Sequence, residues 1–213
     1  SQRNAATGTV RITASTVAAV WLMPGVLAAL QRAEPGLQVE LVASNALDNL
    51  LRREADIAVR MVRPAQGSLI ARKLGEVPIV VAAHRDYLAR AGTPRSPVEL
   101  LQHRLIGYDR DPQLIQGFAA AGMPVTPAHF ALRTDDQVAY GQLVARGAGI
   151  GFVTAYCLAS WPGVRALLPM LQIPPLPCWL AVHREIRGNK VVKRVYDFLA
   201  EAIPRELQRS ALT

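Results

Sequence analysis

Two strand–turn–helix openings, far apart in the chain, constrain the fold of these 213 residues most strongly. The first reads T-V-R-I-T-A-S-T over residues 9–16, and the second reads F-A-L-R-T-D-D-Q over residues 130–137. In each, strand-like alternation stops at small polar side chains and helical spacing takes over. A helix N-terminus leaves backbone N–H groups unpaired and favours an anionic or polar partner. The two openings therefore predict capture of a small molecule rather than a catalytic apparatus.

Strand and helix patterns alternate after the first opening. Strands are expected at residues 9–13, 37–41 and 56–59. A helix from Pro24 to about Ala33, with proline in its first turn, should join the first two strands. A shorter helix capped by Asn45, with Asp48 three residues on and Leu47, Leu50 and Leu51 inward, should join the next two. This β-α-β-α-β order is typical of a parallel sheet with right-handed crossovers.

The middle of the chain has a different pattern. Strands are expected at residues 69–74 and 77–83, with Gly75 separating them. Two capping boxes, Ser96 with Glu99 and Thr134 with Gln137, predict two helix starts, and the second helix should end at Gly147.

The last third returns to strands and one long helix. Residues 149–153 should form a buried strand whose glycines permit close backbone approach. A proline-rich connector over residues 169–177 precedes a strand at 179–182. Asn189 should start a final amphipathic helix.

Composition excludes several classes of protein. An apolar fraction of 51% argues against disorder, and no run of 18 apolar residues predicts a membrane span. A secretory leader is not recognisable at the start, and the two cysteines, Cys157 and Cys178, favour reduced thiols in a cytoplasmic protein. The net charge of +8 fits either an anionic partner or a solvated, arginine-rich surface.

Enzyme signatures are missing from the sequence. It contains no G-x-S-x-G elbow, no Walker A loop and no H-E-x-x-H motif. The glycines at residues 147–151 precede a strand, whereas a dinucleotide loop follows one. Asp135 and Asp136 fit the first turn of a helix, where the dipole favours carboxylates. We therefore expect no catalytic residue, no metal and no cofactor.

Several segments, taken in order, resemble the effector-binding domain of LysR-type transcriptional regulators. They are G-T-V-R-I-T-A-S at residues 8–15, L-M-P at 22–24, E-P-G-L-Q-V-E-L at 34–41, R-R-E-A-D-I-A-V-R at 52–60, D-Y-L-A-R-A-G-T-P at 86–94, P-V-E-L-L-Q-H at 97–103 and V-A-R-G-A-G-I-G-F-V at 144–153. The resemblance spans nearly the whole chain.

The resemblance implies an α/β fold of the type 2 periplasmic-binding-protein class. This fold has two lobes, two sheets with helices on both faces, and two crossover strands. The expected division is residues 1–8 as a linker remnant, 9–76 and 181–207 as lobe I, 77–180 as lobe II, and 208–213 as a C-terminal tail.

The same resemblance implies a small-molecule effector sensor and not an enzyme. Regulators of this family begin with a winged helix-turn-helix, which this sequence lacks, so DNA binding is expected only through that absent N-terminal domain. The runner-up is the solute-binding protein of a transporter, which shares the fold, and an enzyme on the same scaffold is a third class.

An effector is expected between the lobes, at the switch points of the two sheets. The candidate ligand-binding residues are Ser15, Thr16, Ser44, Asn45, Arg60, Tyr108, Thr134, Asp135, Phe152 and Thr154. Helix N-termini and Arg60 favour a small carboxylate. Asp135 and Asp136 oppose a nearby anion, which keeps a cationic or zwitterionic effector open.

The family also implies a homodimer, paired side by side and head to tail, that forms a higher oligomer in the full-length protein. The expected surfaces are the helix from Pro24 to Ala33 and the helix from Asp135 to Arg146. The first offers Val26, Leu27 and Leu30 with small Ala28, Ala29 and Ala33, and the second offers Tyr140, Leu143 and Val144. The competing interpretation is that these residues cover their own sheets.

Overall fold

The computed structural model describes residues 6–46, 55–65 and 67–211. The chain divides into two compact units. Unit 1 comprises residues 1–77 and 175–213, and unit 2 comprises residues 78–174. Each unit is described here by itself.

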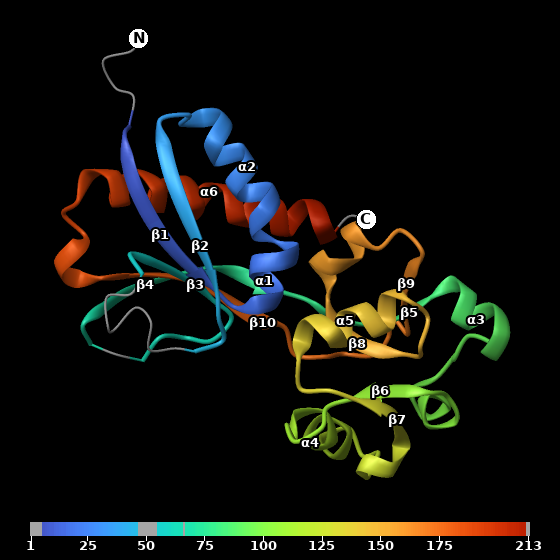
Figure 1. The fold of residues 1–213 in the computed structure, drawn as a ribbon. Coiled ribbons are helices and arrows are strands. Elements are labelled where there is room, and N and C mark those ends of the chain that lie inside the picture. The colour runs from blue at the N-terminus through green and yellow to red at the C-terminus, as the bar shows by residue number, and fades with distance from the viewer. Residues whose placement is uncertain (1–5, 47–54, 66, 212–213) are drawn as a thin grey trace. The chain divides into compact units, whose positions relative to one another are not determined.

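Unit 1 is built on a five-stranded sheet in the order β2-β1-β3-β10-β4 (Figure 1). The strands β1, β2 and β3 are parallel, and β10 runs antiparallel to both β3 and β4. This confirms the predicted parallel pairing of the first three strands. The strand bounds are β1 Gly8–Ala14, β2 Leu37–Ala43, β3 Ile57–Arg60, β4 Leu69–Val77 and β10 Leu176–His183.

Helices α2 and α6 cover one face of this sheet (Figure 1). Val10 and Ile12 of β1 are fully buried on that side, together with Leu30 of α2 and Leu199 of α6. As predicted, Asn189 caps α6: its Oδ1 accepts the N–H groups of residues 191 and 192. The helix bounds are α1 Thr16–Trp21, α2 Met23–Ala33 and α6 Lys190–Ala211, with a 3-10 turn η5 at Arg184–Ile186. The helix predicted after Asn45 lies outside the described residues.

The prediction that Gly75 separates two strands is wrong. Gly75 lies inside β4, opposite Cys178, where the pairing with β10 shifts register by one residue. Its φ of 158° is close to extended backbone, and the extra residue makes a β-bulge. The break between strands falls at Pro78, which has no N–H to give to a ladder.

Unit 2 divides its strands between two small sheets. One has the order β8-β5-β9 and is antiparallel, and the other pairs β6 with β7 in parallel. A parallel bridge between Leu105 and Ile150 connects β6 to the residue before β8. The strand bounds are β5 Ile79–His84, β6 Leu105–Gly107, β7 Phe130–Arg133, β8 Gly151–Thr154 and β9 Val164–Leu167.

In unit 2, side chains of the helices and strands pack together in an apolar core. Tyr87, Leu100, Phe118 and Phe130 pack in this core. The expected close approach at residues 149–153 is present, because a Cβ on Gly151 would lie 2.6 Å from Val144. The helix bounds are α3 Arg85–Ala91, α4 Gln113–Ala120 and α5 Gln137–Ala145, with 3-10 turns η2 Pro97–Gln102, η3 Pro127–His129 and η4 Ala155–Ser160.

Neither predicted capping box forms as expected. Ser96 makes no side-chain cap bond, and Glu99 accepts the N–H of Arg95 at the start of a 3-10 turn rather than an α-helix. The N-cap of α5 is Asp136, whose Oδ1 accepts the N–H of Ala139 at 2.8 Å. The helix ends before Gly147, whose φ of 77° and N–H bond to the Val144 carbonyl fit a Schellman ending.

One expected domain boundary and four of the residues expected on the dimer surfaces need correction. Sequence analysis placed the return to lobe I at residue 181, but the whole of β10 pairs with β3 and β4, so unit 1 resumes at residue 175. Val26, Leu30, Tyr140 and Val144 are buried inside their own units. These four side chains cover their own sheets and cannot form the docking surfaces predicted for them.

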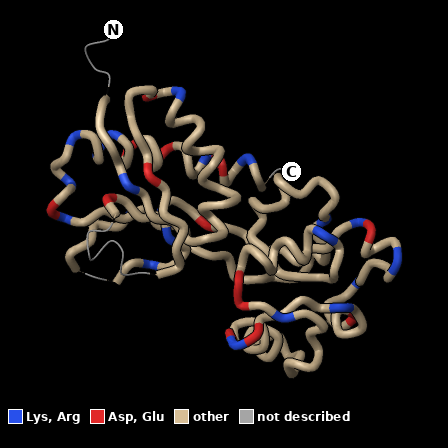
Figure 2. The backbone as a smooth tube through the Cα atoms, in the orientation of Figure 1, with Lys and Arg blue, Asp and Glu red and all other residues tan. Residues whose placement is uncertain are grey.

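Lysine and arginine are spread over both units instead of gathering on one segment (Figure 2). This distribution favours the solvated surface over a nucleic-acid footprint as the origin of the +8 charge. Among the described residues, no helix is long and apolar enough to cross a membrane.

Candidate functional site

The carboxyl ends of three strands meet at one edge of the unit 1 sheet. This follows from the parallel pairing of β1 with β2 and β3. Ser15 and Thr16 follow β1, Ser44 and Asn45 follow β2, and Arg60 ends β3. The structure therefore brings together all five residues that sequence analysis predicted in lobe I. We call these five residues the first polar edge.

Asn45 connects the β2 loop to the start of α1. Its Oδ1 accepts the backbone N–H of Thr16 at 3.0 Å and lies 3.4 Å from the Thr16 hydroxyl. Ser15 is the N-cap of α1, yet its side chain makes no cap bond. Ser15 and Thr16 are half-buried and Asn45 is exposed, so a ligand can reach their polar atoms.

Arg60 holds the loop after β2 in place through hydrogen bonds to its backbone. It is only 5% exposed, and its guanidinium donates to the carbonyls of Ser44 and Ala46. It also donates to the hydroxyl of Thr13 at 2.8 Å. Sequence analysis missed Thr13, which is fully buried. One feature of the sequence could have indicated it: Thr13 places a hydroxyl between two apolar residues, Ile12 and Ala14, at the end of a strand.

The charge of Arg60 is surrounded by neutral oxygens. Burial lowers the pKa of its guanidinium, but an arginine stays protonated in a protein. Among residues 6–46, 55–65 and 67–211, no carboxylate forms an ion pair with it. The first polar edge therefore holds a buried positive charge that its hydrogen bonds orient without neutralising.

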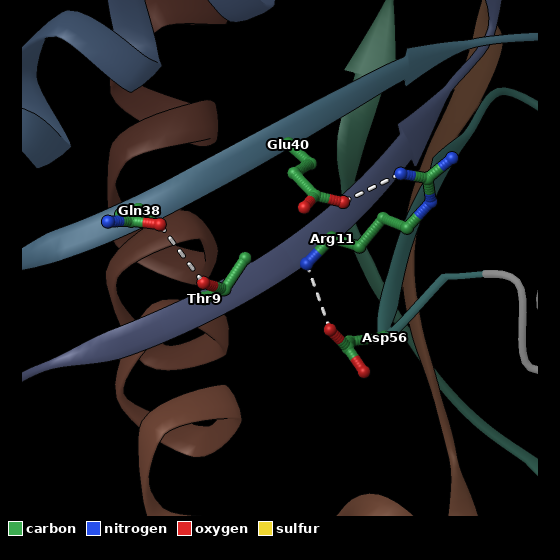
Figure 3. Close-up of polar contacts among 5 residues, drawn as sticks. All are labelled: Thr9, Arg11, Gln38, Glu40 and Asp56. Carbon is green, nitrogen blue, oxygen red and sulfur yellow. Dashed lines mark hydrogen bonds and ion pairs between the residues drawn. The ribbon is translucent and has the colours of Figure 1, made fainter.

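The amino ends of β1 and β2 carry a separate polar ladder, which provides matched controls (Figure 3). Thr9 donates to Gln38 at 3.3 Å, and Arg11 pairs with Glu40 at 2.6 Å. The backbone N–H of Arg11 also donates to Asp56. Thr9, Arg11, Gln38 and Glu40 are exposed and Asp56 is half-buried. Thr9 lies near the end of β1 that is opposite to Thr16, and Arg11 lies in the middle of the strand.

In unit 2, Tyr108 and Thr134 follow the two parallel strands β6 and β7. The N–H of Thr134 donates to the carbonyl of Gly107 at 3.0 Å, which holds the two strand ends together. The Tyr108 ring lies 5.2 Å from the ring of Tyr140. Burial raises the pKa of the Tyr108 phenol, and a side-chain hydrogen bond with Gln137 opposes that shift.

Asp135 clamps the loop that follows β6. Its carboxylate accepts the backbone N–H groups of Asp109, Arg110 and Asp111 at 2.9 to 3.1 Å. These hydrogen bonds, that of Asp111 first, lower the pKa of Asp135. The carboxylate thus has partners within unit 2, and the helix dipole is not its main environment.

Phe152 and Thr154 lie on β8 and are half-buried. The Phe152 ring packs edge-on against Phe118 at 5.6 Å, and the Thr154 hydroxyl lies 3.2 Å from the sulfur of Cys157. Tyr140, which sequence analysis assigned to a docking surface, accepts the N–H of Phe152 and donates to the carbonyl of Ile106. It therefore joins β8 to β6 through one buried hydroxyl.

We call the unit 2 candidates the second polar edge: Tyr108, Thr134, Asp135, Phe152 and Thr154. Tyr140 and Gln137 support them, and neither was on the predicted list. The sequence pattern does not predict that Tyr140 joins β6 to β8, because its two hydrogen-bond partners lie on strands that are distant in sequence.

The described residues offer little for catalysis or metal binding. They contain no group of three or more His, Cys, Asp or Glu side chains that could hold a metal ion. Cys157 and Cys178 are both buried, and burial raises the pKa of each thiol to about 12. Neither thiol is a ready nucleophile, because nucleophilic attack needs the thiolate.

The comparison with protein families is decisive. The LysR substrate binding domain family matches residues 3–204. The chain belongs to this family. Among curated proteins, the HTH-type transcriptional activator AaeR of Escherichia coli K12 is 27% identical over 210 residues, which cover 93% of this chain and 67% of that protein.

Solved structures of LysR regulators show the same fold. The regulatory domain of CrgA from Neisseria meningitidis superposes with a TM-score of 0.78 at 25% identity, covering 93% of this chain and all of that one. The effector domain of AmpR from Pseudomonas aeruginosa gives a TM-score of 0.73 at 20% identity and covers 98% of this chain and all of that one. The expected type 2 periplasmic-binding-protein fold is thereby confirmed, and the matched relatives do not favour a transporter protein.

Proposed function

We propose that this LysR substrate-binding domain senses a small polar effector through its two polar edges. The observation that carries the proposal is the first polar edge, where three parallel strands end on hydroxyl and amide side chains around the buried charge of Arg60. Ligands of open α/β sheets bind outside the carboxyl ends of strands. At the second polar edge, Tyr108 and Thr134 follow the ends of the two parallel strands β6 and β7.

The effector class that fits these edges best is a small carboxylate. Arg60 contributes a positive charge that only neutral oxygens surround among the described residues. Asp135, which would oppose an anion, already accepts three backbone N–H groups. A cationic or zwitterionic effector such as an amino acid is the alternative, because Asp135 and Asp136 of unit 2 would oppose a nearby anion.

A thermal-shift screen of metabolites tests the proposal. A ligand present at 100 times its dissociation constant adds about 2.7 kcal/mol to the free energy of unfolding. We expect small carboxylates to raise the melting temperature and matched amines of the same skeleton to leave it unchanged. Stabilisation by the amines alone would show that the effector is cationic and not a carboxylate. Turnover of any stabilising compound would show that the domain is an enzyme and not a sensor.

We propose that the domain acts by binding and not by catalysis, as part of a cytoplasmic transcription regulator. The support is that the matched relatives are transcription regulators. The chain spans about two thirds of the length of AaeR, and we assign effector sensing and pairing to these residues.

We also propose a homodimer that uses the outward side of α2. Leu27 is half-buried and Ala28 is exposed, and both line a shallow groove beside the edge strand β2. Sedimentation equilibrium at micromolar concentration should give a mass near twice 23.1 kDa. Ala28→Arg should produce monomers, whereas Ala119→Arg on the exposed side of α4 should not. A parent protein that sediments as a clean monomer would refute the dimer.

A further inference from the structure

Unit 2 contains a hollow lined by residues that belong to neither polar edge. Its volume is about 430 Å³, within the range of about 300–1,000 Å³ typical of small-molecule sites. The lining includes Tyr87 and Arg90 of α3, Gln102 at the end of η2, and His103 and Arg104 just after it. None of these residues belongs to the proposed effector site.

Three of the lining residues are joined by a short chain of hydrogen bonds. The backbone N–H of Arg104 donates to the Tyr87 hydroxyl at 3.0 Å, and that hydroxyl lies 2.8 Å from Nδ1 of His103. The direction of the bond between the hydroxyl and Nδ1 follows the tautomer of the imidazole. With the ring proton on Nε2, the hydroxyl donates to Nδ1 and the Nε2–H can donate to a ligand.

Two of the lining residues, Arg90 and Arg104, are positively charged. Arg90 donates to the carbonyl of Gly147 at 3.1 Å, which fixes its guanidinium beside the turn after α5. In the described part of the chain, no hydrogen bond or ion pair involves the guanidinium of Arg104. No carboxylate lines the hollow. The nearest acidic residue in sequence, Asp86, lies in the first turn of α3, where its carboxylate is 3.6 Å from Nδ1 of His84. Glu99 accepts the N–H of Arg95.

The helix ends nearby do not cancel this charge. The carboxyl end of a helix carries about half a negative elementary charge, which Arg90 complements in the last turn of α3. The two guanidinium groups carry a full positive charge each, so the lining stays positive. Guanidinium groups present planar donor forks that match oxyanions.

We propose that this hollow binds a small oxyanion of the phosphate type, held by Arg90, Arg104 and the Nε2–H of His103. The site is independent of the effector site, because its residues share no contact with either polar edge in the described hydrogen bonds. Free phosphate and a phosphate monoester present the same terminal oxygens. Inorganic phosphate and glycerol phosphate are therefore the two probes.

Calorimetric titration of the whole chain with each probe tests the proposal, in chloride buffers of matched ionic strength. Arg104→Gln removes the guanidinium and keeps the backbone N–H bond to Tyr87, so the fold is retained. Arg133→Gln on the exposed strand β7 is the matched control. We expect Arg104→Gln to weaken phosphate binding at least tenfold and Arg133→Gln to leave it unchanged.

Three results would overturn the proposal. They are no saturable binding of either probe at millimolar concentration, equal binding by parent and Arg104→Gln, or equal loss in Arg133→Gln, which would indicate screening of general surface charge. A preference for the monoester over the free ion would identify a phosphorylated metabolite. Thr16→Ala should leave phosphate binding intact, which separates this site from the effector site.

Discussion

At the scale of single residues, Arg60 is the clearest case of a side chain that holds its neighbours in place. Its donors reach two carbonyls of the β2 loop and the Thr13 hydroxyl, so one planar fork serves three acceptors. Arg60→Lys supplies a point charge that cannot reach all three. We expect the free energy of unfolding to fall by about 1–3 kcal/mol, the cost of leaving a buried acceptor unpaired.

Denaturant unfolding measures that loss, and Arg11→Lys is its control. Arg11 pairs with Glu40 on the exposed ladder, with both side chains about half exposed (Figure 3). Its replacement should change stability by less than about 0.5 kcal/mol. Equal effects of the two substitutions would show that burial of Arg60 contributes nothing.

The two cysteines lead to a pH prediction. Burial raises both thiol pKa values from 9.0 to about 12, so unfolding above pH 9 releases protons. The free energy of unfolding should therefore fall between about pH 9 and pH 12, by up to about 1.4 kcal/mol per thiol and pH unit. Comparing the parent with the Cys157→Ser and Cys178→Ser double variant isolates this slope. Rapid labelling of either thiol in the native protein at neutral pH would contradict the burial argument.

At the scale of elements, the start of α5 shows what sequence patterns can and cannot place. The strand–turn–helix order over residues 130–137 was predicted from periodicity and is present. The cap was misplaced by two residues, because Thr134, Asp135 and Asp136 all carry acceptors suited to a helix start. Tertiary contacts decide among them: Asp135 turns to the loop after β6, which leaves Asp136 to cap.

This assignment predicts different effects for neighbouring substitutions. Asp136→Ala should cost about 1 kcal/mol of stability, the usual value of an N-cap, and Thr134→Ala should cost less.

In NMR titrations, the amide signals of Asp109, Arg110 and Asp111 should shift together with a midpoint below 3.8, since hydrogen bonding lowers the pKa of Asp135. The contribution of this clamp to stability is fully present above pH 3.8, the unfolded pKa, and is lost as the pH falls from there through the folded pKa. Asp135→Asn should abolish the common titration, and its persistence would point to another acid.

At the scale of the whole molecule, the order of the strands and the family were accessible from sequence. Alternation and proline placement located β1, α2 and β2 because local pattern determines them. The unit boundary at residue 175 was not accessible, since it depends on the pairing of β10 with two strands more than 100 residues earlier. Thr13 and Tyr140 were missed for the same reason, because only their long-range partners reveal their roles.

We propose above all that the first polar edge binds the effector. Equilibrium binding of the strongest ligand from the metabolite screen, compared between Thr16→Ala and Thr9→Ala, tests it most directly. Both substitutions remove a threonine hydroxyl at the end of β1, but only Thr16 lies at the carboxyl end beside Asn45. We expect about tenfold weaker binding for Thr16→Ala, the value of one hydrogen bond to a charged ligand, and parent affinity for Thr9→Ala. Parent affinity in Thr16→Ala would contradict it.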